Sequence, residues 1–401
     1  MKAMENRARG SAAQHQGAAM KKGWQTKTLG EACEMYQPKT ISGKDMVEDG
    51  SYPVYGANGV IGRYNQFNHE EPQLLITCRG ATCGSVNISA PRSWVTGNAM
   101  VVRPKNESLQ MRYLEYVFRG GIDISKAITG AAQPQITRTN LEPLEISFPE
   151  SLPEQQRIVG LLDEAFEGLA TAKANAEKNL QNARALFESH LKSVFTQRGS
   201  GWVETTLGEV CEFENGDRGK NYPNRNEYVE TGIPWINTGH IQPDGTLSME
   251  EMNFITREKF DSLRSGKIQP RDLVYCLRGA TLGKTALVDP LTEGAVASSL
   301  VILRPSSLLD GSFLYFFLTS PAGQGLIKGF ENGAAQPNLG AKSVAKYPIS
   351  FPKLPEQRKI ADSLIELREQ THHLARLYEQ KLAALEALKK SLLHQAFTGE
   401  L

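Results

Sequence analysis

An internal repeat constrains the fold of this 401-residue chain more than any other feature of its sequence. Four phrases occur twice in the same order, and the two copies lie 178 to 203 residues apart. They are Trp-x-x-x-x-Leu-Gly-Glu from Trp24 and Trp202, Arg-Gly-Ala-Thr from Arg79 and Arg278, Gly-Ala-Ala-Gln-Pro from Gly130 and Gly333, and Leu-Pro-Glu-Gln from Leu152 and Leu354. An ordered repeat of this length indicates a duplicated structural unit, so the sequence predicts two domains of one fold.

The distance between the two copies also predicts where helices lie. It grows by 21 residues between the first two phrases, and loops tolerate such insertions. From Pro153 to Phe195 it stays at 202, which is typical of one continuous helix. Pro153 and Pro355 suit a first helical turn, apolar residues then recur at intervals of three and four, and Gly399 suits a helix end. At about 1.5 Å per residue, each helix of about 45 residues would be roughly 65 Å long.

The segments before each helix contain short β-like runs bounded by Gly and Pro. These runs are 74–77, 99–102 and 144–147 in the first copy and 273–275 and 300–303 in the second. We therefore predict an α+β fold in which two tandem domains of mixed α and β structure are each followed by a long helix. The expected parts are a disordered tail over 1–22, a domain over 23–152, a helix over 153–198, a domain over 199–354 and a helix over 355–401. Two like units can pack about a pseudo-two-fold axis, and the helices would then form an antiparallel coiled coil that acts as a ruler.

Composition narrows the class of protein. Hydrophobic residues make up 40% of the chain and charged residues 22%, as in ordinary globular proteins. The sequence has no apolar run of about 18 residues and no secretory leader, so we expect a cytoplasmic protein with no membrane contact. The five cysteines are an odd, scattered number, which favours buried reduced thiols. The net charge is only +1, so a nucleic-acid surface would have to be a local basic patch.

No catalytic constellation is visible in the sequence. It has no phosphate-binding loop and no His-Glu-x-x-His zinc motif. Glycines over 55–62 match no dinucleotide-binding spacing, so we interpret this stretch as a strand with tight turns. His372 and His373 lie on a charged helix, where solvent exposure is the simplest interpretation.

Polar and basic residues in the loops of both domains suit contacts to DNA. Arginine pairs with guanine edges, asparagine and glutamine pair with adenine, and lysine pairs with phosphate. The candidates are Lys39, Lys44, Asn58, Arg63, Arg79, Gln133, Gln135 and Arg138 in the first domain, and Arg218, Lys220, Arg225, Asn237, His240, Arg278, Lys284, Gln336 and Asn338 in the second. Arg79 and Arg278 belong to a repeated phrase, so for them a structural role is slightly favoured.

The loops differ between the copies where the framework phrases repeat. The stretch over 37–44 has little in common with the stretch over 216–223. Two copies of one scaffold with different loops imply two different targets read together. On DNA this predicts an asymmetric, split site whose half-site spacing follows the geometry of the protein.

Taken together, in this order and doubled, the motifs resemble the specificity (S, HsdS-type) subunits of Type I restriction–modification systems. The resemblance covers residues from about 20 to 401. Besides the four repeated phrases it rests on Tyr-Pro-Val-Tyr-Gly-Ala-Asn-Gly from Tyr52 and on the ending Leu-His-Gln-Ala-Phe-Thr-Gly-Glu-Leu from Leu393. The N-terminal tail is longer than the family pattern.

The resemblance implies two target-recognition domains joined by a long antiparallel helical pair, each reading one half of a bipartite double-stranded DNA site. It implies no catalytic activity in this chain. Two modification (methyltransferase) subunits would bind S-adenosylmethionine and methylate adenine, and restriction subunits would use ATP and Mg. The helices would dock these partners through their apolar stripe, for which the candidates are Leu161, Leu169, Leu180, Leu367, Leu374 and Leu385.

Three alternatives to this interpretation stay open. In the first, the chain is a DNA-independent coiled-coil adaptor with two ligand-binding domains. In the second, it is an enzyme of a new type. In the third, it is the specificity module of another methylation-based defence system. The absence of paired acid–base or nucleophile motifs argues against an enzyme. The identity of the partner would separate the last alternative from a Type I subunit.

Overall fold

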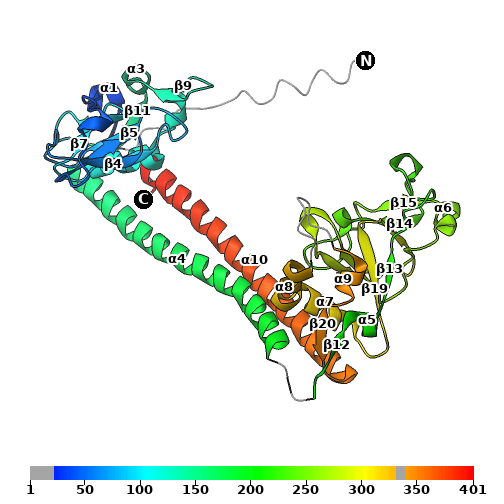
Figure 1. Ribbon diagram of the computed structural model, residues 1–401. Helices are drawn as coiled ribbons and strands as arrows, with labels where there is room; N and C mark the ends of the chain where they lie inside the picture. The colour runs from blue at the N-terminus through cyan, green and yellow to red at the C-terminus, as the bar shows by residue number, and fades with distance from the viewer. Residues whose placement is uncertain (1–21, 198, 200, 331–338) are drawn as a thin grey trace. The chain divides into compact units, whose positions relative to one another are not determined.

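The computed structural model describes residues 22–197, 199, 201–330 and 339–401 (Figure 1). The tail predicted over 1–22 thus lies outside the described residues except for Lys22. The chain divides into two compact units. Unit 1 consists of residues 1–176 and 381–401, and unit 2 of residues 177–380. Each unit contains one globular domain and a part of each long helix.

The domain of unit 1 is built from short elements. Its strands are β1 (Trp24–Thr28), β2 (Cys33–Tyr36), β3 (Tyr52–Gly56), β4 (Gly59–Tyr64), β5 (Leu74–Thr77), β6 (Val86–Ile88), β7 (Trp94–Val95), β8 (Ala99–Pro104), β9 (Ile128–Thr129), β10 (Gln135–Ile136) and β11 (Glu145–Pro149). Its helices are α1 (Leu29–Ala32), η1 (Gly43–Asp45), α2 (Met111–Tyr116), η2 (Val117–Gly121), η3 (Ile124–Ala127) and α3 (Arg138–Leu141).

The domain of unit 2 follows a similar order. Its strands are β12 (Val203–Thr206), β13 (Cys211–Asn215), β14 (Ile233–Ile236), β15 (Asn253–Ile255), β16 (Leu273–Cys276), β17 (Thr285–Leu287), β18 (Ala295–Val296), β19 (Leu300–Pro305) and β20 (Pro348–Phe351). Its helices are α5 (Leu207–Val210), η4 (Arg225–Glu227), η5 (Thr238–His240), α6 (Arg257–Ser262), η6 (Gly279–Thr281), α7 (Gly311–Thr319), α8 (Pro321–Phe330) and α9 (Ala341–Val344).

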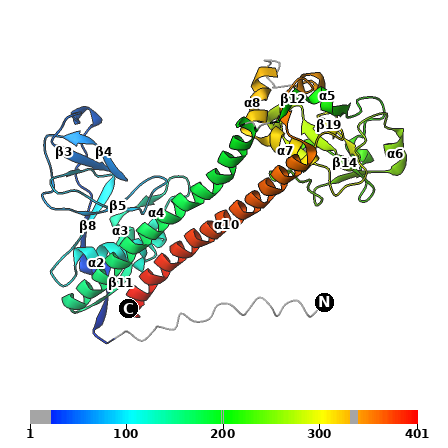
Figure 2. The same ribbon diagram turned by 90° about the horizontal axis from the view of Figure 1, so that it is seen from below.

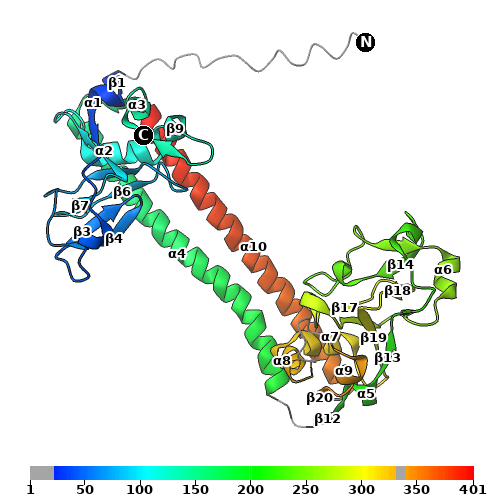
Figure 3. The ribbon, with the colours of Figure 1, turned by 45° about the horizontal axis from the view of Figure 1, so that its top comes forward.

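The sheets of the two domains have matching topologies, which confirms the duplicated fold (Figure 3). In unit 1 a four-stranded sheet has the order β2-β8-β5-β6 and a three-stranded sheet the order β4-β3-β7. In unit 2 the corresponding orders are β13-β19-β16-β17 and β15-β14-β18. The strands predicted at 74–77, 99–102, 144–147, 273–275 and 300–303 are β5, β8, β11, β16 and β19, with ends shifted by up to two residues.

The first strand and the last strand of each domain close it beside the long helix. Strand β1 pairs antiparallel with β11, and β12 pairs antiparallel with β20. The repeated Leu-Gly-Glu phrase begins a short helix at this point. Leu29 donates its backbone N–H to Leu144 O at 2.7 Å, and Leu207 donates to Tyr347 O at 3.0 Å. This phrase is therefore part of the framework.

The predicted long helices are α4 (Leu152–Thr196) and α10 (Leu354–Thr398), each 45 residues long. Gly399 follows α10 with φ +78°, a left-handed conformation that favours glycine and ends the helix as expected. Within each unit the two helix segments run antiparallel. In unit 1 Lys389 of α10 lies over the Phe166 ring of α4, and in unit 2 Arg184 of α4 pairs with Glu379 of α10 at 2.7 Å.

Each domain shares its core with the helix segments of its own unit. In unit 1, Ile158 and Leu162 of α4 and Leu393 of α10 join the domain core, and all are at most 5% exposed. In unit 2, Phe195 of α4 packs against Phe313 and Phe317 of α7 with edge-to-face rings. Figure 2 shows the end of α4 close to α7. The helix ends are thus fixed to the domains by apolar contacts. Among the described residues, no helix is long and apolar enough to cross a membrane.

Candidate nucleic-acid interface

Three predicted residues of the first domain lie together around one open pocket. Arg79 and Gln135 form an isolated antiparallel bridge, and Gly80 donates its N–H to Pro134 O at 3.1 Å. These contacts bring the repeated Arg-Gly-Ala-Thr and Gly-Ala-Ala-Gln-Pro phrases side by side. Arg79, Gly80, Gln133, Pro134 and Gln135 line a pocket of about 530 Å³, and the side chains of Arg79, Gln133 and Gln135 are exposed. The pocket offers donors and acceptors that fit guanine and adenine edges.

Other candidates of the first domain are exposed, and several of them form hydrogen bonds or ion pairs within the domain. The Arg63 guanidinium donates to Gly50 O at 2.5 Å and to Ser51 O at 3.0 Å, so it holds the turn before β3. Arg138 pairs with Glu142 at 2.6 Å on α3, and Asn58 accepts from Asn87 at 2.9 Å. Lys39 and Lys44 are exposed in the loop after β2. These residues lie on the surface, and Arg63 has a clear structural task.

A corresponding pocket of the second domain is lined by three arginines. Arg218, Arg264 and Arg278 surround an open pocket of about 460 Å³, together with Asn215, Gly216, Asp217, Ser265, Leu277, Leu339, Gly340 and Ala341. Arg218 and Arg278 were predicted from the sequence, and Arg218 donates to Ser298 O at 3.2 Å. Arg278 is exposed and precedes η6. In both domains the arginine of the repeated Arg-Gly-Ala-Thr phrase therefore borders a polar pocket.

Arg264 was missed by the sequence reasoning although it lies inside the insertion that distinguishes the second copy. The insertion is a sequence signal, because it separates the two copies by 21 additional residues. Helix α6 lies in this region, and the described part of the first domain has no counterpart between β4 and β5. Arg264 lies two residues after the end of α6 and faces Asp217, which only the three-dimensional structure shows.

Asp217 organises the loop beside the arginine pocket. This carboxylate is 2% exposed, and it accepts backbone N–H groups from Arg264 at 2.9 Å and Gly219 at 2.8 Å. It also accepts from the Arg264 guanidinium at 3.2 Å. These hydrogen bonds, the one from the Arg264 backbone first, lower the pKa of Asp217 to about 2. Asp217 is therefore a carboxylate at neutral pH.

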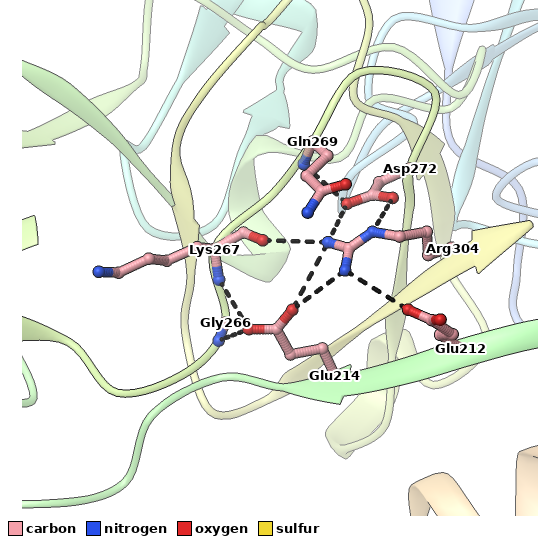
Figure 4. Close-up of polar contacts among 7 residues, drawn as sticks. All are labelled: Glu212, Glu214, Gly266, Lys267, Gln269, Asp272 and Arg304. Atoms are coloured by element: carbon pink, nitrogen blue, oxygen red, sulfur yellow. Dashed lines mark hydrogen bonds and ion pairs between the residues drawn. The ribbon is translucent and has the colours of Figure 1, made fainter.

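A second carboxylate cluster fixes the segment that follows Arg264 (Figure 4). Glu214 on β13 accepts the backbone N–H groups of Gly266 at 2.6 Å and Lys267 at 3.2 Å. Arg304 on β19 forms two bonds to Asp272, at 3.0 and 2.9 Å, and reaches Glu214 at 3.5 Å. Burial raises the pKa of Asp272, and Arg304 counteracts that rise. The segment over 264–272 is thus held against strands β13 and β19.

His240 is a correction to the predicted contacts. It is only 3% exposed, and its ring accepts from the Asn237 backbone N–H at 3.1 Å. The amide of Asn253 lies 3.3 Å from the other ring nitrogen. Burial lowers the pKa of His240, which favours the neutral form of the ring. The buried His240 therefore stabilises the turn after β14. Asn237 is half-buried, accepts the Gly239 N–H at 2.8 Å in the same turn, and stays a predicted contact.

The remaining candidates of the second domain divide into two groups. Lys220, Arg225 and Lys284 are exposed on loops or short turns. Gln336 and Asn338 lie outside the described residues.

Four of the five cysteines are buried and all are free thiols, and among the described residues no three His, Cys, Asp or Glu side chains are placed to hold a metal ion.

The predicted partner-binding leucines are spread along both helices with different exposure. Leu161 and Leu374 are 42% and 38% exposed. Leu169, Leu180, Leu367 and Leu385 are half-buried. In unit 1, Leu169 and Leu385 line a narrow groove between α4 and α10 together with Phe166, Ala170, Lys173, Glu386 and Lys389.

Comparison with known proteins decides the family. The profile of the Type I restriction modification DNA specificity domain matches residues 21–180 and 199–386, which is most of both halves of the chain. The chain belongs to this family. Its members are the DNA-recognition subunits of Type I systems, so the chain is a Type I specificity subunit. The two matched segments coincide with the two copies of the internal repeat.

Named relatives and solved structures agree with this assignment. The specificity subunit of the Type I restriction enzyme MjaVIII from Methanocaldococcus jannaschii is 22% identical over 397 residues, covering 90% of each chain. The EcoKI specificity subunit of Escherichia coli K12 is 26% identical over 204 residues, covering 50% of this chain and 43% of that subunit.

Two solved structures share the fold across nearly the whole chain. The HsdS subunit from Thermoanaerobacter tengcongensis has a TM-score of 0.59 at 18% identity, covering 96% of this chain and 99% of that one. A chain from a structure describing complex assembly and conformational transition of the type I R-M system has a TM-score of 0.70 at 18% identity, with coverage of 96% and 100%.

Proposed function

We propose that this specificity subunit reads an asymmetric, bipartite site in double-stranded DNA, one half-site with each domain. The observation that carries the proposal is the pair of pockets beside the repeated arginines. One common framework places Arg79 and Arg278 at corresponding positions, yet among the described lining residues Arg79 is the one arginine of the first pocket, whereas Arg218 and Arg264 stand beside Arg278 in the second. Glutamine and arginine side chains favour different bases. The two domains would therefore recognise different short sequences.

The subunit itself performs no chemistry in this proposal. It directs methyltransferase subunits and restriction subunits to the site, in defence against foreign DNA. S-adenosylmethionine, ATP and Mg would be bound by those partners, and the methyltransferase would flip the target adenine out of the duplex. Support comes from the duplicated unit, which makes two modification subunits the natural number. A mass measurement of the complex purified with its modification subunit tests that number, and we expect two copies per specificity subunit.

A base-resolution map of methylated adenine in host DNA, with and without this gene, tests the central proposal. We expect deletion of the gene to remove methylation from a single split motif. If the motif persists, or if it is continuous instead of split, the proposal is wrong. Active modification subunits must be present in both strains, and their expression is measured in the same cells.

A single substitution tests the assignment of one pocket to one half-site. Gln133→Ala removes an exposed amide from the first pocket. We expect relaxed specificity at one or two bases of one half-site and no change in the other. Gln156→Ala is the matched control, because it removes an exposed glutamine from α4 in the same unit. Equal relaxation of both half-sites would reassign the loop over 130–135 to the framework.

A further inference from the structure

Arg264 is an exposed arginine whose orientation is set by a buried carboxylate. Its side chain is 71% exposed, whereas the side chain of Asp217 is only 2% exposed. Asp217 binds both the backbone N–H of Arg264, at 2.9 Å, and one terminal nitrogen of its guanidinium, at 3.2 Å. Among the described residues, the other guanidinium nitrogens of Arg264 have no partner. The arginine thus offers free donors from a fixed position at the edge of the pocket.

The surrounding backbone leaves little room for this arrangement to change. A Cβ atom at Gly219 would lie 2.2 Å from the terminal nitrogen of Arg264, so a larger residue there would displace the guanidinium from this position. Gly266 has φ +81°, and a Cβ atom there would lie 2.7 Å from Gly216 Cα. Glu214 binds the backbone of Gly266 and Lys267 on the other side (Figure 4). The position of Arg264 is therefore determined before any ligand arrives, which lowers the entropy cost of binding.

The charge balance favours a base edge over a phosphate as the ligand. The Arg264 and Asp217 pair has no net charge, and the carboxylate would repel a phosphate held by the same guanidinium. A guanine edge carries two neutral acceptors, O6 and N7, that accept a planar pair of arginine donors. Although Arg218 and Arg278 leave the pocket as a whole positively charged, Arg264 offers directional donors from a pair without net charge, and such donors suit recognition of a base better than attraction of the DNA backbone.

We propose that Arg264 is a specificity-determining residue that reads a guanine in the second half-site, with Asp217 as its positioning residue. This inference rests on the proposed DNA-reading function and assigns a base type to one residue of it. It concerns a segment that follows α6, in the insertion peculiar to the second domain. Because Arg218 and Arg278 border the same pocket, the guanine would lie at a short distance from the bases that they approach.

The experiment uses the full chain in complex with its modification subunits. Methylation of a library with every base at each position of the second half-site is measured for the wild type, Arg264→Lys, Arg264→Ala and Asp217→Asn. We expect both Arg264 variants to lose discrimination for guanine at one position by about 10- to 100-fold, which corresponds to one bidentate base contact. Asp217→Asn should relax the same position to a smaller extent. The first half-site should be unchanged in all variants.

Two controls separate base reading from phosphate binding and from a folding defect. Arg257→Ala removes a neighbouring exposed arginine of α6, which pairs with Glu293, and it should leave the motif unchanged. If Asp217→Asn fails to fold, the Arg264 variants still decide, because they alter an exposed side chain. Uniform weakening for all library members, with a smaller salt dependence, would identify a phosphate contact and overturn the proposal.

The wild type alone also provides a decisive outcome. A split motif whose second half-site contains no guanine on either strand would overturn the assignment of Arg264 while leaving the proposed function intact. Absence of any split motif would overturn the proposed function and this inference together. A split motif with a guanine that becomes degenerate only in the Arg264 and Asp217 variants supports both.

Discussion

Gln155 and Gln357 make the same three hydrogen bonds, one in each unit. The side-chain carbonyl of Gln155 accepts the N–H of Gln110 at 2.9 Å, and its amide donates to Ser108 O and Pro149 O, both at 2.8 Å. Gln357 accepts from Asp310 at 2.8 Å and donates to Leu308 O at 2.8 Å and Pro352 O at 2.9 Å.

Both glutamines are 0% exposed, so the repeated Leu-Pro-Glu-Gln phrase has a structural reason. Each amide joins the first turn of a long helix to the end of the last strand of its domain and to the loop before an earlier helix, α2 in unit 1 and α7 in unit 2. A buried amide with all of its donors and acceptors satisfied fixes the angle at which the helix leaves the domain.

Gln155→Ala should destabilise unit 1 strongly. The substitution removes the partner of one backbone N–H and two backbone carbonyls, of which that of Pro149 is buried and those of Gln110 and Ser108 belong to half-buried residues, and such groups cost about 1 to 3 kcal/mol each when water does not replace the lost bond. We expect a total loss of about 3 kcal/mol in the free energy of unfolding, measured by urea denaturation. Gln156→Ala changes the adjacent exposed glutamine and should cost less than about 0.5 kcal/mol. Equal effects of the two substitutions would show that the hydrogen bonds of Gln155 do not fix the long helix to its domain.

Arg304→Met should destabilise unit 2 in a pH-dependent way. It leaves the Asp272 side chain, which is 1% exposed, without its bidentate partner, at a cost of about 3 kcal/mol at pH 7. Burial already raises the pKa of Asp272, and loss of Arg304 raises it further. The unfolded chain titrates alike with and without Arg304, so the deficit grows as the pH rises above the folded-state pKa of Asp272 in the wild type, which already lies above the ordinary value of 3.8. Urea denaturation at pH 4.5 and pH 7 measures the difference.

The matched control for Arg304→Met is Arg257→Met. Arg257 also makes two bonds to one carboxylate, at 2.6 and 3.0 Å from Glu293, but both side chains are largely exposed. Exposed ion pairs contribute about 0 to 1 kcal/mol, so this variant should be nearly as stable as the wild type at either pH. A deficit for Arg304→Met that stays constant with pH would show that lost packing, not the unpaired carboxylate, causes it.

The framework could be predicted from the sequence because the repeated phrases lie at positions where both copies make the same contacts to the backbone. Gln155 and Gln357 and the short helices at Leu29 and Leu207 are such positions. Strands and helices can be predicted from the alternation and spacing of apolar residues, because each of these structures has its own local period. The buried partners of Gln155 are 6 to 47 residues away, so the phrase was visible in the sequence but its bonding was not.

The candidate interface was predicted less well, because loop side chains of the same type have different surroundings. His240 is buried and Arg63 holds a turn, although both belong to polar loops. Arg264 becomes notable only through Asp217, which is 47 residues away in sequence. No local pattern distinguishes an arginine that supports a loop from one that a buried carboxylate presents to solvent.

Leu374→Lys should weaken binding of the modification subunit while leaving the fold stable. Leu374 is 38% exposed on α10, so a charge there costs the isolated chain little. If the apolar stripe docks a partner, the charge is buried in the complex, and we expect at least a 10-fold loss of affinity in a titration with purified modification subunit. Leu308→Lys changes a 60% exposed leucine outside the long helices and serves as the control. Equal affinities of the two variants would exclude Leu374 from the interface.

Changing both long helices by one heptad tests the hypothesis that they act as a ruler, which remains a prediction from the sequence. Each helix has 45 residues, and removal of seven shortens it by about 10.5 Å, or roughly three base pairs of DNA. Three base pairs also rotate one half-site by about 100° around the DNA axis, whereas a heptad turns a helix by only about 20°. We therefore expect methylation at the native spacer to be lost and weak activity to appear at shorter spacers. A matched insertion of seven residues in each helix should shift the preference to longer spacers. An unchanged spacer in both variants would show that helix length does not set the distance between the half-sites.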